Sequence, residues 1–223
     1  MHHLTAGVKG FATDMCYFGL DEMRQACGGA GFLLSSGIAD HWVDIAPFPT
    51  FEGSNPVMIN QASRLIFKNI KKVFNGKTPK GHFEYLAKID ELLLAGQNGG
   101  TTVAEVSTLD YIEKALAMRA AYEVTEVHKL ISSDEAPKNV KENEIYALDI
   151  ARMTRVHMIY LTFKLARERI ETAQVNSPNI LKYAEVCIKI FAMKQILLDH
   201  KSLYESGFFK RGSNRLVDLA YRE

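Results

Sequence analysis

The sequence contains few cysteines and almost no net charge, and both features exclude whole classes of protein. Its three cysteines, Cys16, Cys27 and Cys187, are too few and too widely spaced for a disulfide framework or a cysteine metal motif. We expect free, buried thiols in a reducing compartment. A net charge of +1 gives no bulk attraction to nucleic acids or acidic membrane surfaces. We therefore expect no nucleic-acid partner.

Long hydrophobic runs are also missing. The longest near-apolar run, residues 188–198, is interrupted by Lys189, Lys194 and Gln195, so it is no candidate for a transmembrane helix. The first residues lack the charged and then apolar pattern of a secretory signal. The composition, 47% hydrophobic and 24% charged, is typical of a globular protein. The sequence therefore predicts no transmembrane segment.

The histidine patterns that bind metals in helical proteins do not occur. The seven histidines are never four residues apart, and no Glu-x-x-His is present, which argues against a di-iron or helical zinc site. We predict no metal. His157 shares an apolar face with Met153 and Tyr160, which favours a core histidine with a hydrogen-bond partner. We expect His128 and His200 at the surface.

What the sequence does contain is helical periodicity, with no useful strand-like alternation. Gly28 and Gly29 are suited to end the first helix, and Ser54 or Asn55 can cap the second, with Pro56 at its first position. The stretch between them, residues 30–53, is irregular. The predicted helices cover about 4–27, 54–74, 83–95, 107–131, 142–173 and 179–205, with a short one from 213. The expected fold class is all-α. The helix at 142–173 is apolar on two faces, as in a helical bundle.

The segment NGKTPKG, residues 75–81, is typical of a linker. It predicts two parts of unequal size: residues 1–75, a linker at 76–82, and residues 83–223.

Two blocks of sequence resemble the acyl-CoA oxidase family. They are MRQACGGAGFLLSSGI, residues 23–38, and APFPTFEGSNPVMINQASRLIFK, residues 46–68. The family carries C-R-x-A-C-G-G-H-G-Y, then S-S-G-[ILV], then T-x-E-G-[DE]-N-x-V-x-x-x-Q-x-A-R. The matching residues are Arg24, Ala26, Cys27, Gly28, Gly29, Gly31, Ser36, Gly37, Thr50, Glu52, Gly53, Asn55, Val57 and Gln61. The segment 147–165 is similar to a later helix of the family, so the resemblance spans nearly the whole chain.

The resemblance implies helical bundles of the acyl-CoA oxidase/dehydrogenase C-terminal type. Residues 1–75 would be part of the first, flavin-side C-terminal helical domain, and residues 83–223 the second. The sequence departs from the family pattern at four positions. Ala30 stands in place of His, Phe32 in place of Tyr, Ser54 in place of an acidic residue and Ser63 in place of Ala.

The resemblance also implies roles for individual residues. Glu52 would be the base that removes the α-proton of an acyl-CoA, and Phe48, Pro49 and Phe51 could form an apolar slot around it. FAD would be bound by Gln25, Gly28, Gly29, Ser54 and Asn55. The alternative is that Glu52 is an ordinary residue at a helix start. Gly28 and Gly29 can stop a helix and also contact a cofactor.

The family's enzymes form trans-2-enoyl-CoA and hydrogen peroxide, in the β-oxidation of fatty acids. They hold FAD and acyl-CoA between these helices, an N-terminal helical domain and a β-domain that this sequence lacks. The chain alone should therefore bind neither well, and a homo-oligomer or a heteromeric partner should supply the missing walls. A non-catalytic accessory or scaffold subunit is the alternative. The family implies a peroxisomal location, although residues 221–223 are not a peroxisomal tripeptide; a mitochondrial location is the alternative.

Overall fold

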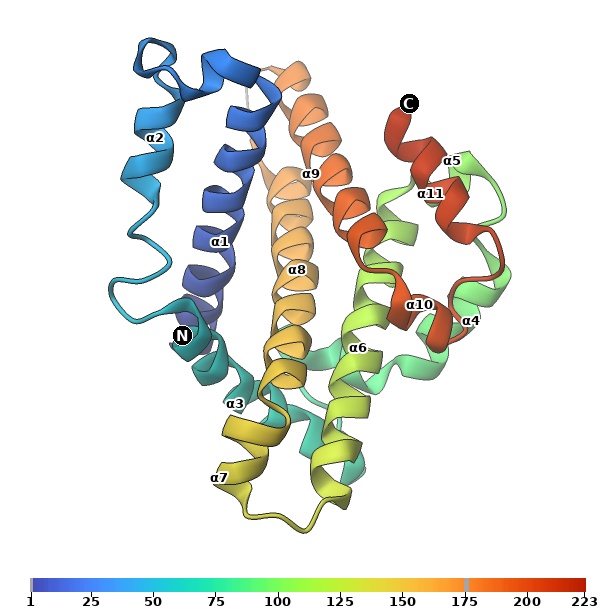
Figure 1. Cartoon of the computed structure of the whole chain (residues 1–223). Helices are drawn as coiled ribbons and strands as arrows, with labels where there is room; N and C mark the ends of the chain where they lie inside the picture. Colours follow the sequence, from blue (N-terminus) through green and yellow to red (C-terminus); the bar gives the residue numbers. More distant parts are fainter. Residues whose placement is uncertain (1, 175–176) are drawn as a thin grey trace. The chain divides into compact units, whose positions relative to one another are not determined.

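The structure is a computed structural model that describes residues 2–174 and 177–223. Within these ranges the secondary structure is helical, without a strand, which confirms the all-α prediction (Figure 1). The α-helices are α1 His2–Ala26, α2 Ile38–Ile45, α3 Asn55–Phe74, α4 Ile89–Asn98, α5 Val103–Val106, α6 Leu109–Ser133, α7 Lys138–Val140, α8 Ala147–Thr172, α9 Pro178–Leu198, α10 Lys201–Glu205 and α11 Ser213–Arg222. Three short 3-10 helices, η1 Gly28–Phe32, η2 Leu34–Ser36 and η3 Gly81–Ala87, and a π-helical turn, η4 Lys141–Ile145, complete them.

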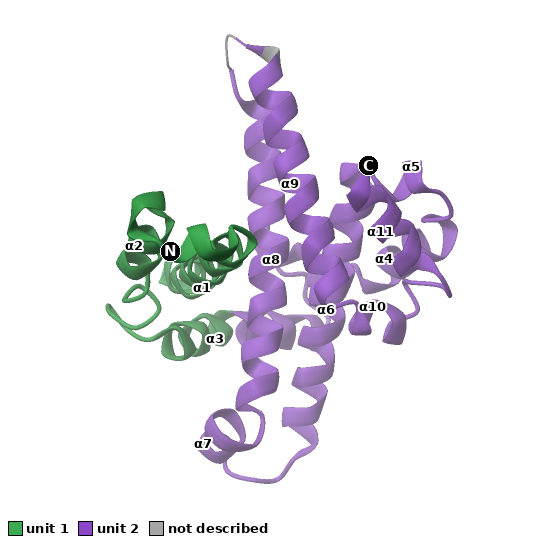
Figure 2. Cartoon of the chain, turned by 45° about the horizontal axis from the view of Figure 1, so that its top comes forward, with its two compact units in different colours: residues 1–65 green, residues 66–223 purple. Residues whose placement is uncertain are grey.

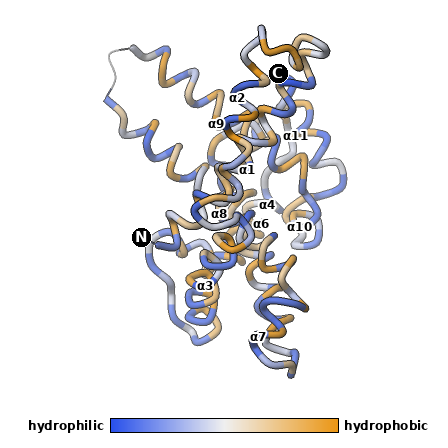
Figure 3. The backbone as a smooth tube through the Cα atoms, turned by 60° about the vertical axis from the view of Figure 1, so that its left-hand side comes forward, coloured by the Kyte–Doolittle hydropathy of each residue, from blue (hydrophilic) through white to orange (hydrophobic). Residues whose placement is uncertain are grey.

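Hydrophobic and hydrophilic residues alternate along these helices, as the colouring in Figure 3 shows. Within the described ranges, no helix combines the length and the hydropathy that crossing a bilayer requires.

The chain divides into two compact units, residues 1–65 and residues 66–223 (Figure 2). The boundary falls inside α3, ahead of the linker predicted at 76–82. Residues 77–80 have no regular secondary structure. The assignment of residues 1–75 and 83–223 to two C-terminal helical domains stays a prediction.

Unit 1 is built from α1, α2 and the first part of α3. A side chain at Gly10 would place its Cβ 2.9 Å from Cγ1 of Ile59, so glycine allows α1 and α3 to approach closely. The helix α2 lies within the stretch 30–53 that the sequence described only as irregular. It spans eight residues, bounded by left-handed Gly37 and by a loop with two prolines, and so short a helix leaves little periodicity to detect.

Unit 2 has the antiparallel pair α6 and α8 at its centre. The fully buried core side chains on these helices include Leu116, Val124, Met153 and Phe163. Apolar residues surround α6 on several sides, because α4, α8, α9 and α10 all pack against it. The expected bundle packing is therefore present in this unit.

Two helix boundaries differ from the prediction. The helix expected at 142–173 begins with the π-helical turn η4 and continues regularly only from Ala147. The helix expected at 179–205 is two helices, since Asp199 adopts an extended conformation between α9 and α10. A backbone interruption of this kind leaves the apolar spacing on either side unchanged, so periodicity does not reveal it.

The structure also tests the predictions for histidine and cysteine. His157 is fully buried, and its Nδ1 lies 2.8 Å from the hydroxyl of Tyr85, as expected for a core histidine. The surface prediction for His128 is wrong: its ring is 8% exposed and packs edge-on against Phe74, and burial lowers its pKa. The three cysteines are free, but they are exposed rather than buried. Cys16 and Cys187 lie on exposed faces of α1 and α9, and Cys27 lies in the turn that follows α1.

Candidate functional site

Glu52 lies on a tight turn that joins α2 to α3. Backbone bonds from Thr50 and Phe51 to the carbonyl of Pro47, 2.9 and 3.0 Å long, fold the chain back before the helix. Glu52 has φ +57° and Gly53 has φ +96°, and Glu52 is the one non-glycine residue with positive φ in the described ranges. The left-handed conformation costs a residue with a Cβ roughly 1–2 kcal/mol. Backbone strain of this kind concentrates at functional sites.

The carboxylate of Glu52 is exposed to solvent in this chain. Phe48 and Phe51 are 42% and 45% exposed, and their rings pack edge to face with centroids 5.0 Å apart. The two rings therefore contact each other beside the turn, and within unit 1 they do not enclose the carboxylate. An apolar slot for Glu52 would need further walls.

Asn55, the first residue of α3, is 3% exposed and is held by three residues of α1. Its Nδ2 donates to Oδ1 of Asp14 at 2.5 Å and to the hydroxyl of Thr13 at 2.9 Å. Its Oδ1 accepts a bond of 2.8 Å from the ammonium of Lys9, which also donates to the carbonyl oxygen of Gly53 at 2.6 Å. The Asn55 amide thus joins the Glu52 turn to α1.

Gln25 belongs to a polar cluster at the C-terminal end of α1. Its Nε2 donates to Oδ2 of Asp21 at 2.7 Å, while Arg24 donates to Oδ1 of the same carboxylate at 2.7 Å. These bonds, first that from Arg24 and then that from Gln25, lower the pKa of Asp21. The guanidinium of Arg24 lies 5.4 Å from the ring centroid of Trp42, which stacks on Tyr17. The Gln25 amide is therefore oriented within the chain.

Gly28 and Gly29 follow directly in the exposed η1. Nothing lies within 4 Å of the position where a Cβ would stand at either residue. A planar or extended group can therefore reach this stretch of backbone, as binding a cofactor edge requires. The predicted residues thus form two groups: Glu52, Ser54 and Asn55 on the turn before α3, and Gln25, Gly28 and Gly29 where α1 ends.

Comparison with known proteins shows which family this region belongs to. Residues 1–67 match the model of the acyl-CoA oxidase C-alpha1 domain. Over 178 residues the chain is 32% identical to peroxisomal acyl-coenzyme A oxidase 1 of Mus musculus, an alignment that covers 78% of this chain and 27% of the mouse protein. This chain is homologous to the C-terminal region of acyl-CoA oxidases.

Solved acyl-CoA oxidases share the fold over almost the entire chain. The Arabidopsis thaliana acyl-CoA oxidase 1 structure gives a TM-score of 0.89 at 22% identity, covering 99% of this chain and 33% of the other. Acyl-CoA oxidase-1 of Caenorhabditis elegans, solved in complex with FAD and ATP, gives a TM-score of 0.84 at 19% identity, with the same coverage. The chain therefore spans about a quarter to a third of the length of its acyl-CoA oxidase relatives.

All six predicted site residues fall inside the acyl-CoA oxidase C-alpha1 match at 1–67. The sequence did not single out Lys9, Thr13 or Asp14, which hold the Glu52 turn. A weak signal exists in the sequence: Lys9 and Thr13 are four residues apart, so they lie on one face of α1. Their partner, Asn55, is more than 40 residues away, and periodicity cannot identify it.

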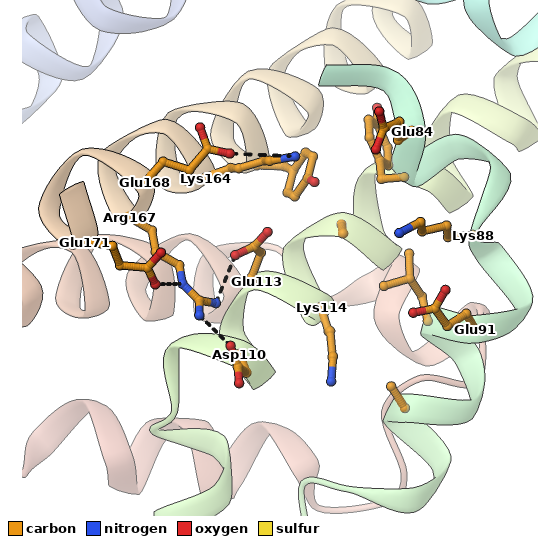
Figure 4. Close-up of a pocket in the computed structure, with 15 residues that line it drawn as sticks. Glu84, Lys88, Glu91, Asp110, Glu113, Lys114, Lys164, Arg167, Glu168 and Glu171 are labelled. Atoms are coloured by element: carbon orange, nitrogen blue, oxygen red, sulfur yellow. Dashed lines mark hydrogen bonds and ion pairs between the residues drawn. The ribbon is translucent and has the colours of Figure 1, made fainter. Parts of the chain in front are cut away.

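A cavity of about 520 Å³ lies in unit 2, outside the matched C-alpha1 domain (Figure 4). It is lined by η3, α4, α6 and α8. Arg167 pairs there with Asp110 at 2.6 Å, Glu113 at 3.0 Å and Glu171 at 2.7 Å. Its walls carry charges of both signs, and several are already paired across the cavity. Nothing in the sequence predicted this cavity.

A substitution at Gly31 tests how closely η1 packs against α1. A Cβ at this position would lie 1.9 Å from the backbone oxygen of Arg24, so no larger residue fits without moving backbone. We expect Gly31→Ala to destabilise unit 1 by ~1–3 kcal/mol. Urea unfolding followed by the fluorescence of Trp42, the single tryptophan, measures this change in unit 1.

Gly29→Ala is the matched control for that experiment, because its Cβ meets open space and its φ is not positive. It should change stability by less than about 0.5 kcal/mol. Equal effects of the two substitutions would contradict the close packing of η1 on α1.

Proposed function

We propose that this chain is the C-terminal part of an FAD-dependent acyl-CoA oxidase, with Glu52 as its base. In this function the Glu52 carboxylate takes the α-proton of an acyl-CoA. FAD, when bound, would accept the hydride that leaves the β-carbon. Gln25, Gly28 and Gly29, with Ser54 and Asn55, would contact the FAD. The peroxisome, where the named relatives occur, is the compartment that this function favours.

The observation that carries the proposal is the conformation of Glu52. A non-glycine residue in the left-handed region, within the matched C-alpha1 domain, is held there by bonds from α1 to the residues after it. An ordinary residue at a helix start does not need this strained conformation, and strained backbone of this kind clusters at active sites, which supports a functional role for Glu52.

The exposed backbone of η1 could contact FAD, but only along one edge of the cofactor. The predicted residues stand on the surface of one unit, and both Phe48 and Phe51 remain open to solvent. The other walls must come from chain regions outside these 223 residues or from another subunit. A homo-oligomer and a heteromeric partner both satisfy this requirement.

We expect the 223-residue chain, purified alone, to retain neither FAD nor acyl-CoA and to self-associate. The physical reason for association is an exposed apolar face on α1, where Val8, Phe18 and Met23 are 41–59% exposed. Absorbance at the flavin maxima and light scattering after gel filtration measure these outcomes. A monodisperse monomer that is stable at micromolar concentration would contradict the expected association.

The test of the function uses the chain in the assembly purified from its source. Flavin absorbance together with acyl-CoA-dependent peroxide formation supports the oxidase. A flavin-free assembly without such activity supports the alternative, an accessory or scaffold subunit. The solvent exposure of Glu52 is the observation that keeps this alternative open. Identifying the co-purifying polypeptides shows what supplies the missing walls.

A further inference from the structure

Lys9, on α1, makes two hydrogen bonds to residues just before and at the start of α3 instead of extending into solvent. Its ammonium donates to the carbonyl oxygen of Gly53 at 2.6 Å and to Oδ1 of Asn55 at 2.8 Å. It therefore bridges two acceptors on either side of Ser54, immediately after Glu52. Both acceptors lie 44 or more residues from Lys9 in the sequence.

The geometry fixes the orientation of the Asn55 side chain as well. The amide oxygen faces the Lys9 ammonium, and the amide nitrogen faces the carboxylate of Asp14 at 2.5 Å. A cation and an anion on the same helix thus hold opposite ends of one buried amide. Hydrogen bonds to charged groups are stronger than those between neutral groups. Asn55 therefore provides a fixed point at the end of the turn.

The strained conformation of Glu52 needs such a restraint. A residue with a Cβ leaves the left-handed region when its surroundings allow it. Lys9 holds the Gly53–Ser54 peptide on one side of Glu52, and the bonds from Thr50 and Phe51 to the carbonyl of Pro47 hold the chain on the other side. Glu52 and Gly53 must therefore join two fixed points, which restrains the conformation of Glu52. No other hydrogen bond to the Gly53 carbonyl oxygen occurs among the described residues.

We propose that Lys9 is a positioning residue for Glu52: by holding the Gly53 carbonyl and the Asn55 amide, it keeps Glu52 in its left-handed conformation and its carboxylate in place. The catalytic half of this inference rests on the proposed oxidase function. The conformational half stands on the geometry of unit 1 alone.

The first experiment uses the 223-residue chain and needs no activity. Lys9→Met should accelerate amide hydrogen exchange in residues 50–57 by at least about tenfold, the loss expected for a bond from a charged donor. Lys9→Arg should restore part of the protection. Lys68→Met, at an exposed lysine of α3, is the matched control and should leave the segment unchanged.

A double-mutant cycle tests the strain itself. Glycine adopts φ +57° without the steric cost of a Cβ, and this gain should exceed its entropic cost, so Glu52→Gly should raise the melting temperature of the wild-type chain. In the Lys9→Met background the turn can relax, and the same substitution should give less than half that rise. Equal shifts in both backgrounds, or unchanged exchange in residues 50–57, overturn the inference whatever the enzyme does.

The second experiment uses the flavin-containing assembly. Lys9→Met should lower kcat at least about tenfold and leave KM within about twofold, because misplacing the base affects proton transfer more than binding. Lys9→Arg should recover much of kcat. A wild-type assembly without activity refutes the proposed function and the catalytic half here, while the exchange and cycle experiments still decide the conformational half. If Lys9→Met keeps full kcat while amide hydrogen exchange in residues 50–57 is accelerated, only the catalytic half of the inference is overturned.

Discussion

In the flavin-loaded assembly, Glu52→Gln should lower acyl-CoA-dependent peroxide formation by about 10²–10⁴-fold, the usual loss when a general base is removed. The amide has nearly the shape of the carboxylate and the same turn conformation, but it cannot accept the α-proton. Flavin content should be unchanged, since the residues that would contact FAD remain. The measurement is peroxide release per bound flavin, for wild type and variant.

Glu52→Asp is the second variant of this series. It keeps the charge and moves the carboxylate back by one methylene, so it should also lose rate if the proton transfer depends on geometry. A structural role predicts something else. Glu52→Gln would then change stability by only a few tenths of a kcal/mol and leave the rate intact. An active wild type matched by Glu52→Gln would exclude Glu52 as the base.

The largest stability effect is expected in unit 2, at Arg119. Its side chain is fully buried on α6, and Nη1 donates to the carbonyl oxygens of Gln195 and Asp199, at 2.7 and 2.8 Å. These carbonyls lie where α9 ends, so Arg119 satisfies acceptors that the helix leaves open. Arg119→Ala should destabilise the unit by ~3–5 kcal/mol, because it opens a cavity and removes both hydrogen bonds. Chemical unfolding followed by circular dichroism measures the loss.

We expect the volume of the Arg119 side chain to contribute more to stability than its charge. Burial lowers its pKa to about 10, and its Nε and Nη2 have no hydrogen-bond partner in the described structure. Arg119→Met keeps most of the volume and removes the buried charge, so it should lose less than half as much stability as Arg119→Ala. Arg222→Ala, at an exposed ion pair with Asp218, is the surface control and should stay within about 0.5 kcal/mol. An equal loss in Met and Ala variants would contradict this account.

The helices could be predicted because helix formation is largely local. The apolar spacing of α6 and α8 and the glycines after α1 are written into short windows of sequence, and the structure has helices there. The motif around Glu52 likewise indicates the acyl-CoA oxidase family from residues that are close together in the sequence. The helix α2 was missed because eight residues between a glycine and two prolines carry too little periodic signal.

By itself, the sequence determined the helical class, the family resemblance and the identity of Glu52 as the candidate base. Only the tertiary structure decided that Glu52 is left-handed, that Lys9 and Asp14 hold Asn55, and that His128 is buried against Phe74. The physical reason is the distance along the sequence between the residues that interact. Helical periodicity arises from neighbours within one or two turns, whereas these features arise from hydrogen bonds and packing between residues far apart in the chain, which no local pattern specifies.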